Sequence, residues 1–134
     1  MGKILEKEIG ATDVDVTVVT TTETVIVTSP LVKIPVATCR VVIRAWYRIQ
    51  SGTATTGLTQ SIRRGALVTD PLVGEASACA ISAAAGSTEE HGVCVTEQLQ
   101  NQESVQYSLT CTQAGATGNG TARQATIEVE ILNG

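Results

Sequence analysis

The chain has 134 residues and a formal net charge of −4 at pH 7, from nine basic and thirteen acidic side chains. That length is typical of one domain that buries a core of its own. The acidic balance argues against a general nucleic-acid-binding protein, and a hydrophobic content of 43% is too high for a disordered linker.

The residue types favour strands over helices. The chain contains 20 Thr and 16 Val, but only one Met and no Phe. Thr and Val branch at Cβ, which suits the pleated surface of a strand better than a helix. The composition therefore predicts an all-β protein.

We expect residues 1–11 to form a short N-terminal arm before a folded domain at 12–134. Residues 1–10 contain four charged side chains and no unbroken apolar run, so neither a secretory signal nor a capped helix is expected. The arm is either a frayed terminus or a tether laid on a neighbouring subunit. The tether would give a partner to three large aliphatic residues, Ile4, Leu5 and Ile9.

From Val14 onward, the spacing of apolar residues alternates as in half-buried strands. We expect strands at 14–18, 24–28, 31–36, 38–50, 61–68, 92–98, 103–112 and 121–132. The Ala-rich segment 72–85 would permit a helix, but its alternation favours another strand. Loops are expected at 51–59 and 86–92, and a tight turn at 115–120. About eight to ten short strands predict a two-sheet antiparallel β-sandwich or jelly roll.

The segment 38–50 is the clearest predicted strand, and its two faces differ. One face is apolar, whereas the other carries Arg40, Arg44 and Arg48 with Trp46 among them. A tryptophan flanked by arginines on an exposed face is typical of a protein interface. The alternative is that the arm or a loop covers this face, so that Trp46 belongs to a core.

Charges of opposite sign are segregated along the chain. Residues 40–64 contain five arginines and no acid, and residues 70–103 contain six acids and no Lys or Arg. The two segments either lie side by side and neutralise one another, or one of them faces a different subunit. A nucleic-acid surface is the weakest interpretation, because a single tryptophan is a poor stacking platform and the whole chain is acidic.

The residues that usually carry chemistry are few. His91 is the single histidine, so a catalytic triad, a Cys–His pair or a His-rich zinc site would have to use it. The four cysteines, at 39, 79, 94 and 111, include no CxxC motif. The preferred interpretation is that the cysteines are buried strand residues. Disulfides are the second interpretation, and metal ligands are the last. We therefore expect no catalytic residue, no cofactor, no metal ion and no enzymatic activity.

No segment approaches the roughly 20 apolar residues that a membrane-spanning helix needs. We therefore expect a protein that is not inserted in a membrane and has no export signal.

Three segments carry a resemblance to a known family: the strand 38–50, the tetrapeptide Ile62–Gly65, and Tyr107–Thr110 followed by a Gly-Asn-Gly turn. Their order resembles that of small jelly-roll proteins with a tumour-necrosis-factor-like sandwich, which occur among the structural proteins of tailed phages. The likeness covers about residues 14–132.

This resemblance implies a homotrimer that decorates or cements a phage head. Its partners would be other copies of itself and the major capsid protein, with no nucleic acid and no membrane involved. The protein would be made in the host cytoplasm and located on the capsid surface of the virion. The candidate interface residues are Ile4, Leu5, Ile9, Arg40, Arg44, Trp46 and Arg48.

The alternative function is a ligand- or carbohydrate-binding sandwich module of a fibre or adhesin. Sites of that kind use exposed aromatic residues or a calcium-bearing loop. This chain offers only three aromatic residues for the purpose, Trp46, Tyr47 and Tyr107.

Overall fold

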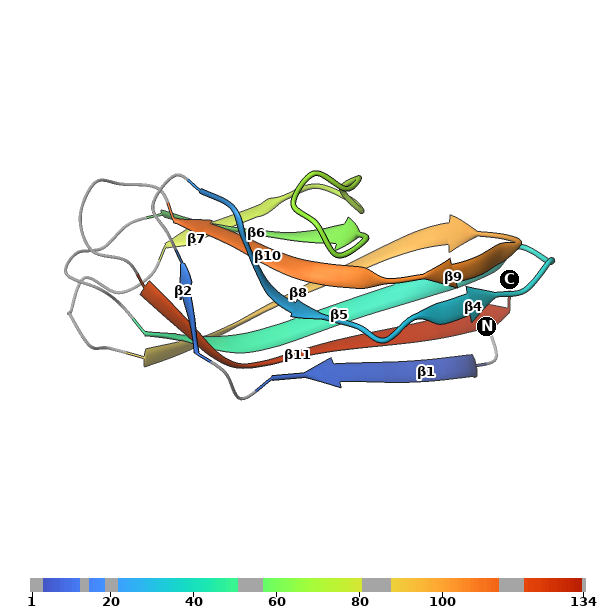
Figure 1. The fold of residues 1–134 in the computed structure, drawn as a ribbon, viewed down its shortest axis with the longest axis horizontal. Helices are drawn as coiled ribbons and strands as arrows, with labels where there is room; N and C mark the ends of the chain where they lie inside the picture. The colour runs from blue at the N-terminus through green and yellow to red at the C-terminus, as the bar shows by residue number, and fades with distance from the viewer. Residues whose placement is uncertain are drawn as a thin grey trace.

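The computed structural model describes residues 4–12, 15–18, 22–50, 57–80, 88–113 and 120–133. Every element of secondary structure in these ranges is a β-strand (Figure 1). They are β1 (Ile4–Ala11), β2 (Val16–Val18), β3 (Thr24–Thr28), β4 (Val32–Ile34), β5 (Cys39–Gln50), β6 (Gly57–Arg64), β7 (Ser77–Ala80), β8 (Thr88–Leu99), β9 (Gln102–Val105), β10 (Tyr107–Gln113) and β11 (Gly120–Asn133). Within the same ranges, no helix is long and apolar enough to cross a membrane.

The strands form two main antiparallel sheets that stack on one another (Figure 1). Sheet A has the order β1-β11-β5-β8, with β2 also paired to β11, and sheet B has the order β3-β10-β6-β7. The short strands β4 and β9 pair separately. Nearly all neighbours are distant in sequence, because the chain crosses repeatedly between the sheets. This is the connectivity of a jelly roll, and the predicted all-β sandwich is confirmed.

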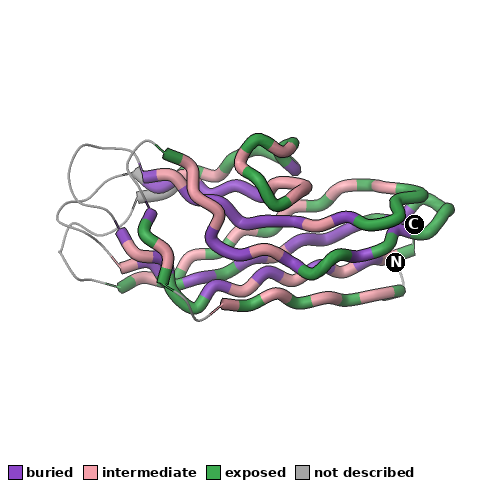
Figure 2. The backbone as a smooth tube through the Cα atoms, viewed as in Figure 1, coloured by how far each residue is buried: buried purple, intermediate pink, exposed green. Residues whose placement is uncertain are grey.

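The core lies between the two sheets, where buried residues alternate with exposed ones along the strands (Figure 2). The inward face of β5 runs from Cys39 to Ile49 and is almost completely buried. The inward residues of β10 and β11 are buried in the same way, including Tyr107, Leu109 and Ile127. The alternation read from the sequence therefore assigns these faces correctly.

Polar side chains also join the sheets across the core. The Tyr47 hydroxyl of sheet A donates to Gln60 Oε1 of sheet B at 2.7 Å, and Gln60 Nε2 donates to the Gly92 carbonyl at 3.0 Å. Nearby, Arg64 Nε lies 3.0 Å from Glu97 Oε2, which also accepts from the Tyr107 hydroxyl. Burial, and then the hydrogen bond with Glu97, raises the pKa of Tyr107, so its phenol stays neutral.

The N-terminal segment differs from the predicted arm. Residues 4–11 are the edge strand β1, paired with β11 from Ile4 opposite Leu132 to Ala11 opposite Thr126. A side chain at Gly10 would place its Cβ 2.2 Å from the Thr28 carbonyl oxygen, so glycine permits β1 to pass close to the end of β3. The described part of the arm therefore belongs to the same sandwich.

The bounds of other strands also differ from the predicted ones. The loop expected at 86–92 is wrong from residue 88 onward, because β8 begins at Thr88 and keeps its alternation through the charged residues. Strand β6 ends at Arg64, and Gly65 turns the chain with φ of 141°. The expected strand at 72–85 is observed as the four residues of β7, and residues 81–85 lie outside the described part of the chain.

Candidate functional site

All seven predicted interface residues lie in sheet A, in two groups. One group is on the edge strand β1 and the other is on β5, with β11 between them. The register places Ile9 beside Glu128, and Glu128 beside Arg44. Side chains of both groups therefore share the face of sheet A that points away from the core, here called the outer face.

The edge strand β1 exposes large aliphatic side chains. Ile4, Leu5 and Ile9 keep 54%, 46% and 53% of their surface accessible. On one side β1 pairs with β11, and no described strand pairs with its other side. An edge that combines unpaired backbone groups with apolar side chains is a template for pairing with another chain.

Arg44 is engaged within its own sheet. Its Nη1 lies 3.2 Å from Glu128 Oε1 and also contacts Glu130, and Lys7 Nζ lies 3.6 Å from Glu128 Oε2. The hydrogen bond with Glu130 raises the pKa of Arg44. Glu128 and Glu130 alternate outward on β11, and their side chains are mostly covered in these ion pairs.

Trp46 lies on the surface, so the interpretation that it belongs to a core is wrong, and its place in an interface stays a prediction. Its side chain is 45% exposed, and its partners in the register are Thr126 on β11 and Gly92 on β8. Gly92 has no side chain to cover the indole. A Cβ added at Gly92 would lie 3.8 Å from Trp46 Cβ, so the two residues are close neighbours across the strands.

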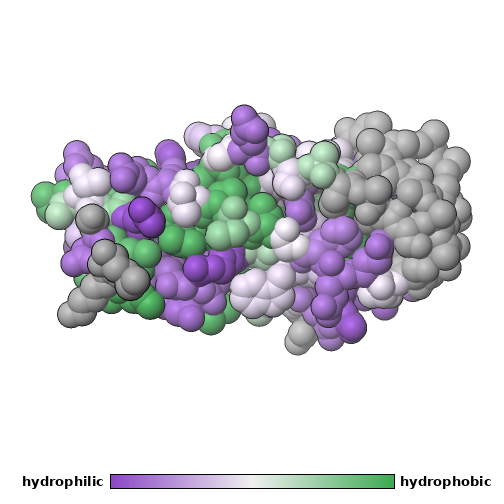
Figure 3. Space-filling view, turned by 180° about the vertical axis from the view of Figure 1, so that it is seen from behind, coloured by the Kyte–Doolittle hydropathy of each residue, from purple (hydrophilic) through white to green (hydrophobic). Residues whose placement is uncertain are grey.

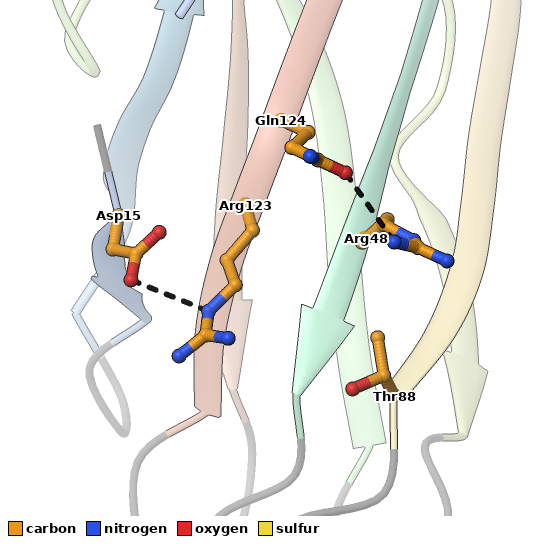
Figure 4. Close-up of a pocket in the computed structure, with 5 residues that line it drawn as sticks. All are labelled: Asp15, Arg48, Thr88, Arg123 and Gln124. Carbon is orange, nitrogen blue, oxygen red and sulfur yellow. Dashed lines mark hydrogen bonds and ion pairs between the residues drawn. The ribbon is translucent and has the colours of Figure 1, made fainter. Parts of the chain in front are cut away.

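Two adjoining hollows of about 400 Å³ each lie on the outer face of sheet A near Trp46. Arg48 and Gln124 line both of them. One hollow also has Asp15, Thr88 and Arg123 in its wall, as Figure 4 shows. The walls of the other include Trp46 and Glu90.

The charged groups of these hollows make long, exposed contacts. Arg123 Nε lies 3.3 Å from Asp15 Oδ2, and Arg48 Nε lies 3.5 Å from Glu90 Oε1. Arg48 Nη1 also donates to Gln124 Oε1 at 3.4 Å. Pairs of this kind between exposed side chains contribute little to stability.

The backbone of β11 is irregular at the same place. The register with β5 shifts between Arg123 and Thr126, and Gln124 has a φ of 50°, which is rare for a residue with a side chain. Such a bulge redirects the side chains around it. Here it directs Gln124 toward Arg48 (Figure 4).

Sequence reasoning singled out Arg48, Trp46, Tyr47 and His91 but missed the remaining residues of the hollows. Arg123 and Gln124 lie in a segment that reads as plain alternation, and Asp15 lies in the predicted strand 14–18 with nothing to mark it. The long-range register that brings β2, β11, β5 and β8 together has no local signal.

The segregated charges are partly neutralised by neighbouring strands. Arg48 pairs with Glu90, and Arg64 pairs with Glu97, as the side-by-side interpretation expects. Arg44 and Arg63 take their partners outside the acidic segment, from β11 and from Glu23.

Of the residues considered for chemistry, His91 lines the hollow beside Trp46, together with Tyr47. The His91 ring stacks on Tyr47 with centroids 6.0 Å apart. Cys39 and Cys111 are buried, Cys94 is exposed, and these three described cysteines are not in disulfides. In the described ranges, no group of three or more His, Cys, Asp or Glu side chains is placed to hold a metal ion.

Comparisons with known proteins show likeness of fold only. No protein-family model and no curated protein sequence matches the chain. A chain in the structure of infectious bursal disease virus, Gx strain, matches with a TM-score of 0.52 and 12% identity, covering 96% of this chain and 32% of that one.

Two further structures match less well. The Gt strain of the same virus gives a TM-score of 0.41 and 12% identity, over 94% of this chain and 32% of the other. The CBM22-1 xylan-binding domain of Xyn10C from Paenibacillus barcinonensis gives a TM-score of 0.35 and 10% identity, over 99% and 97%. The chain thus spans about a third of the length of the virus chains. At this level of identity, the Gx-strain match shows a shared β-sandwich fold.

Proposed function

We propose that the protein is a non-enzymatic virion structural protein that decorates a tailed-phage head and binds the capsid lattice as an oligomer. The observation that carries the proposal is the edge strand β1, which has no described strand on one side and carries three half-exposed aliphatic residues. The sandwich fold shared with a chain of a virus structure is consistent with this function.

Self-association is the first step of the proposed function. In a homotrimer every interface is heterologous, so β1 of one copy must contact a different surface of the next copy. The opposite edge of sheet A, strand β8, is also unpaired on one side among the described strands, and its Val93 and Val95 are only partly buried. Pairing of β1 with β8 of the next copy would extend sheet A from subunit to subunit.

One face of the molecule also has an apolar area, which an oligomer could cover. Seen from behind, hydrophobic residues gather near the middle of the molecule, with hydrophilic residues on both sides (Figure 3). Apolar areas rimmed by polar residues mark interaction sites on many proteins. Covering such an area in an oligomer would remove it from water.

Stabilisation of the capsid would follow from mass action. A subunit that binds only the assembled lattice stabilises that lattice by its binding free energy. Several linked copies add avidity, so no single contact has to be tight. Arg40, which is exposed at the other end of β5 from the hollows, is a candidate contact to the major capsid protein.

The test replaces the apolar side chains of β1 without removing the strand. The variant Ile4→Thr/Leu5→Thr/Ile9→Thr keeps residues that suit strands, and we expect it to be monomeric and to leave capsids unoccupied. The matched control is Leu67→Thr/Leu72→Thr, which removes two exposed leucines from the loop beside sheet B. Native mass by sedimentation and co-sedimentation with capsids of the encoding phage are the measurements. An unmodified protein that is monomeric and does not bind capsids would overturn the proposal.

A second candidate function, a carbohydrate-binding module, is favoured by one observation: the exposed Trp46 beside two polar hollows. Screening the protein on a glycan array would test this candidate, and co-sedimentation with capsids would test the first one separately.

A further inference from the structure

We propose that the hollows beside Trp46 bind a neutral saccharide. The indole would form the platform for a sugar ring, and the surrounding charged and amide groups would bind its hydroxyls. The site is a binding function in addition to capsid decoration, and it does not depend on the oligomer or on the lattice.

Trp46 provides the apolar part of the site. It is the only tryptophan of the chain, and nearly half of its surface is exposed on the outer face of sheet A. The residue opposite it on β8 is Gly92, so no side chain there shields the ring. The face of a pyranose ring that carries C–H groups packs on an aromatic ring of this kind, and binding sites combine such a surface with a few placed polar groups.

The polar groups around Trp46 match what sugar hydroxyls require. A hydroxyl both donates and accepts, a carboxylate only accepts, a guanidinium only donates, and an amide does both. Asp15 and Glu90 supply the acceptors, Arg48 and Arg123 the donors, and Gln124 both. The contacts among these groups use only a few of the roughly ten N–H donors of the two guanidiniums, so most remain for a ligand.

Two arginines beside the hollow lower the stability of the sheet in which they lie. Arg123 and Arg48 are directly opposite in the register of β11 and β5, where like charges destabilise the pairing. Figure 4 shows the two side chains diverging, Arg123 toward Asp15 and Arg48 to the other side, with the hollow between them. Together with the unusual φ of Gln124, this placement of like charges is the kind of local cost that collects at binding sites.

The balance of charge selects a neutral ligand. Among the described residues that line the hollows, two arginines balance two carboxylates, and His91 is counted as neutral in the formal charge. An acidic peptide or a nucleic acid would be repelled by Asp15 and Glu90 as much as it is attracted by the arginines. Each hollow, at about 400 Å³, lies within the volume range of small-molecule sites.

The single tryptophan makes the test direct, because all tryptophan fluorescence reports on this site. The protein is titrated with hexasaccharides of glucose, xylose, mannose and galactose, and with polygalacturonate and polyglutamate as charged probes. We expect at least one neutral hexasaccharide to shift the Trp46 emission to shorter wavelength and to protect it from acrylamide. Raising the salt from about 0.05 M to about 0.5 M should leave this binding unchanged, since it is not driven by net charge.

Three variants test the residues. Arg123→Gln should weaken saccharide binding about tenfold, because it removes charge-assisted donors from the site. The matched control Arg40→Gln, at the far end of the same face, should bind as the unmodified protein does. Trp46→Ala, followed by calorimetry, should lose binding, whereas Trp46→Phe should retain part of it.

Two outcomes overturn the proposal. If no neutral saccharide protects Trp46, the hollows are not a saccharide site. If only the charged polymers protect it, with a steep dependence on salt, the ligand is an acidic macromolecule. The triple variant in β1 should keep the fluorescence response while it loses self-association, so this proposal and the decoration function fail independently.

Discussion

The two outer faces of the sandwich differ in how far the chain covers them. On sheet A, the outer face exposes Trp46, and its Arg48–Glu90 pair has side chains that are 51% and 78% exposed. On sheet B, the outward residues Ser108 and Thr110 have no accessible surface at all. One face therefore meets solvent directly, and the other is closed by the protein itself.

An ion pair closes part of the outer face of sheet B. Arg63 of β6 pairs with Glu23, which precedes β3, through two hydrogen bonds, one of them 2.7 Å long. Glu23 also accepts a hydrogen bond from the Thr110 hydroxyl at 2.6 Å, and Arg63 Nη1 donates to the Asp70 carbonyl at 2.7 Å. Both charges are thus mostly removed from water and fully partnered.

The loop after β6 continues this closure. The Val73 amide donates to the Ile62 carbonyl at 2.8 Å, and the Arg64 amide donates to the Pro71 carbonyl at 2.9 Å. Residues 71–73 therefore run beside β6 and extend the edge that β7 occupies further along. Ion pairs between the same kinds of side chain are therefore covered and stabilising on sheet B, but exposed and of little weight for stability on sheet A.

Among the substitutions that distinguish the two faces, the loss of Glu23 is expected to change the free energy of unfolding most. Glu23→Ala should lower the free energy of unfolding by about 2 kcal/mol, because it leaves Arg63 and the Thr110 hydroxyl without their partner. The measurement is equilibrium denaturation in urea. Glu23→Gln, which keeps an acceptor, is the control and should lose less. A loss below about 0.5 kcal/mol for Glu23→Ala would mean that this ion pair behaves as an exposed one.

The same ion pair should make stability depend on pH. The hydrogen bond from Arg63 holds the pKa of Glu23 below its ordinary value of 4.5. A carboxyl group whose pKa is lower in the folded state stabilises the protein above pH 4.5, and this contribution disappears as the pH falls through the folded pKa.

We therefore expect the stability difference between the unmodified protein and Glu23→Gln to be constant near neutral pH and to shrink below pH 4.5. The difference isolates Glu23 from other carboxyl groups. A difference that grows on acidification would have the wrong sign and would contradict the assigned partner.

These faces also show what the sequence can and cannot predict. Alternation assigned the inward and outward residues of β5 and β10 correctly, because the two-residue period of a strand is a local property. Alternation cannot tell that Ser108 and Thr110 would be covered. Thr110 donates to Glu23 and Ser108 lies opposite Arg63 in the register, which are contacts between segments distant in sequence. From the sequence alone, these polar side chains are predicted to face solvent.

The site shows the same limit. Trp46 and Arg48 stand out because they lie on one clear strand. The residues opposite them depend on the register of β11 and on its bulge at Gln124, which only the packed sheet determines. The N-terminal segment was read as an arm because its charges and short length hide the pairing with β11, 120 or more residues away in sequence for most of its partners.

A smaller effect is expected at Ser108 on the closed face. Its hydroxyl is buried and has no hydrogen-bond partner among the described residues. Ser108→Ala removes that unsatisfied group with little change in volume, so we expect the free energy of unfolding to rise by about 1 kcal/mol. Urea denaturation measures it, with Ser104→Ala on the exposed part of β9 as the control. A loss of stability would reveal a partner for the hydroxyl.

The smallest effect is expected on the open face, at Glu90. Its contact with Arg48 is 3.5 Å long and joins two exposed side chains. Glu90→Ala should therefore change the free energy of unfolding by less than about 0.5 kcal/mol, and raising the salt should not enlarge the change. The same variant should weaken saccharide binding at Trp46, which fluorescence titration measures. A stability loss near that of Glu23→Ala would mean that the charges of sheet A hold the fold together as those of sheet B do, and the open face would then have no groups to spare for a ligand.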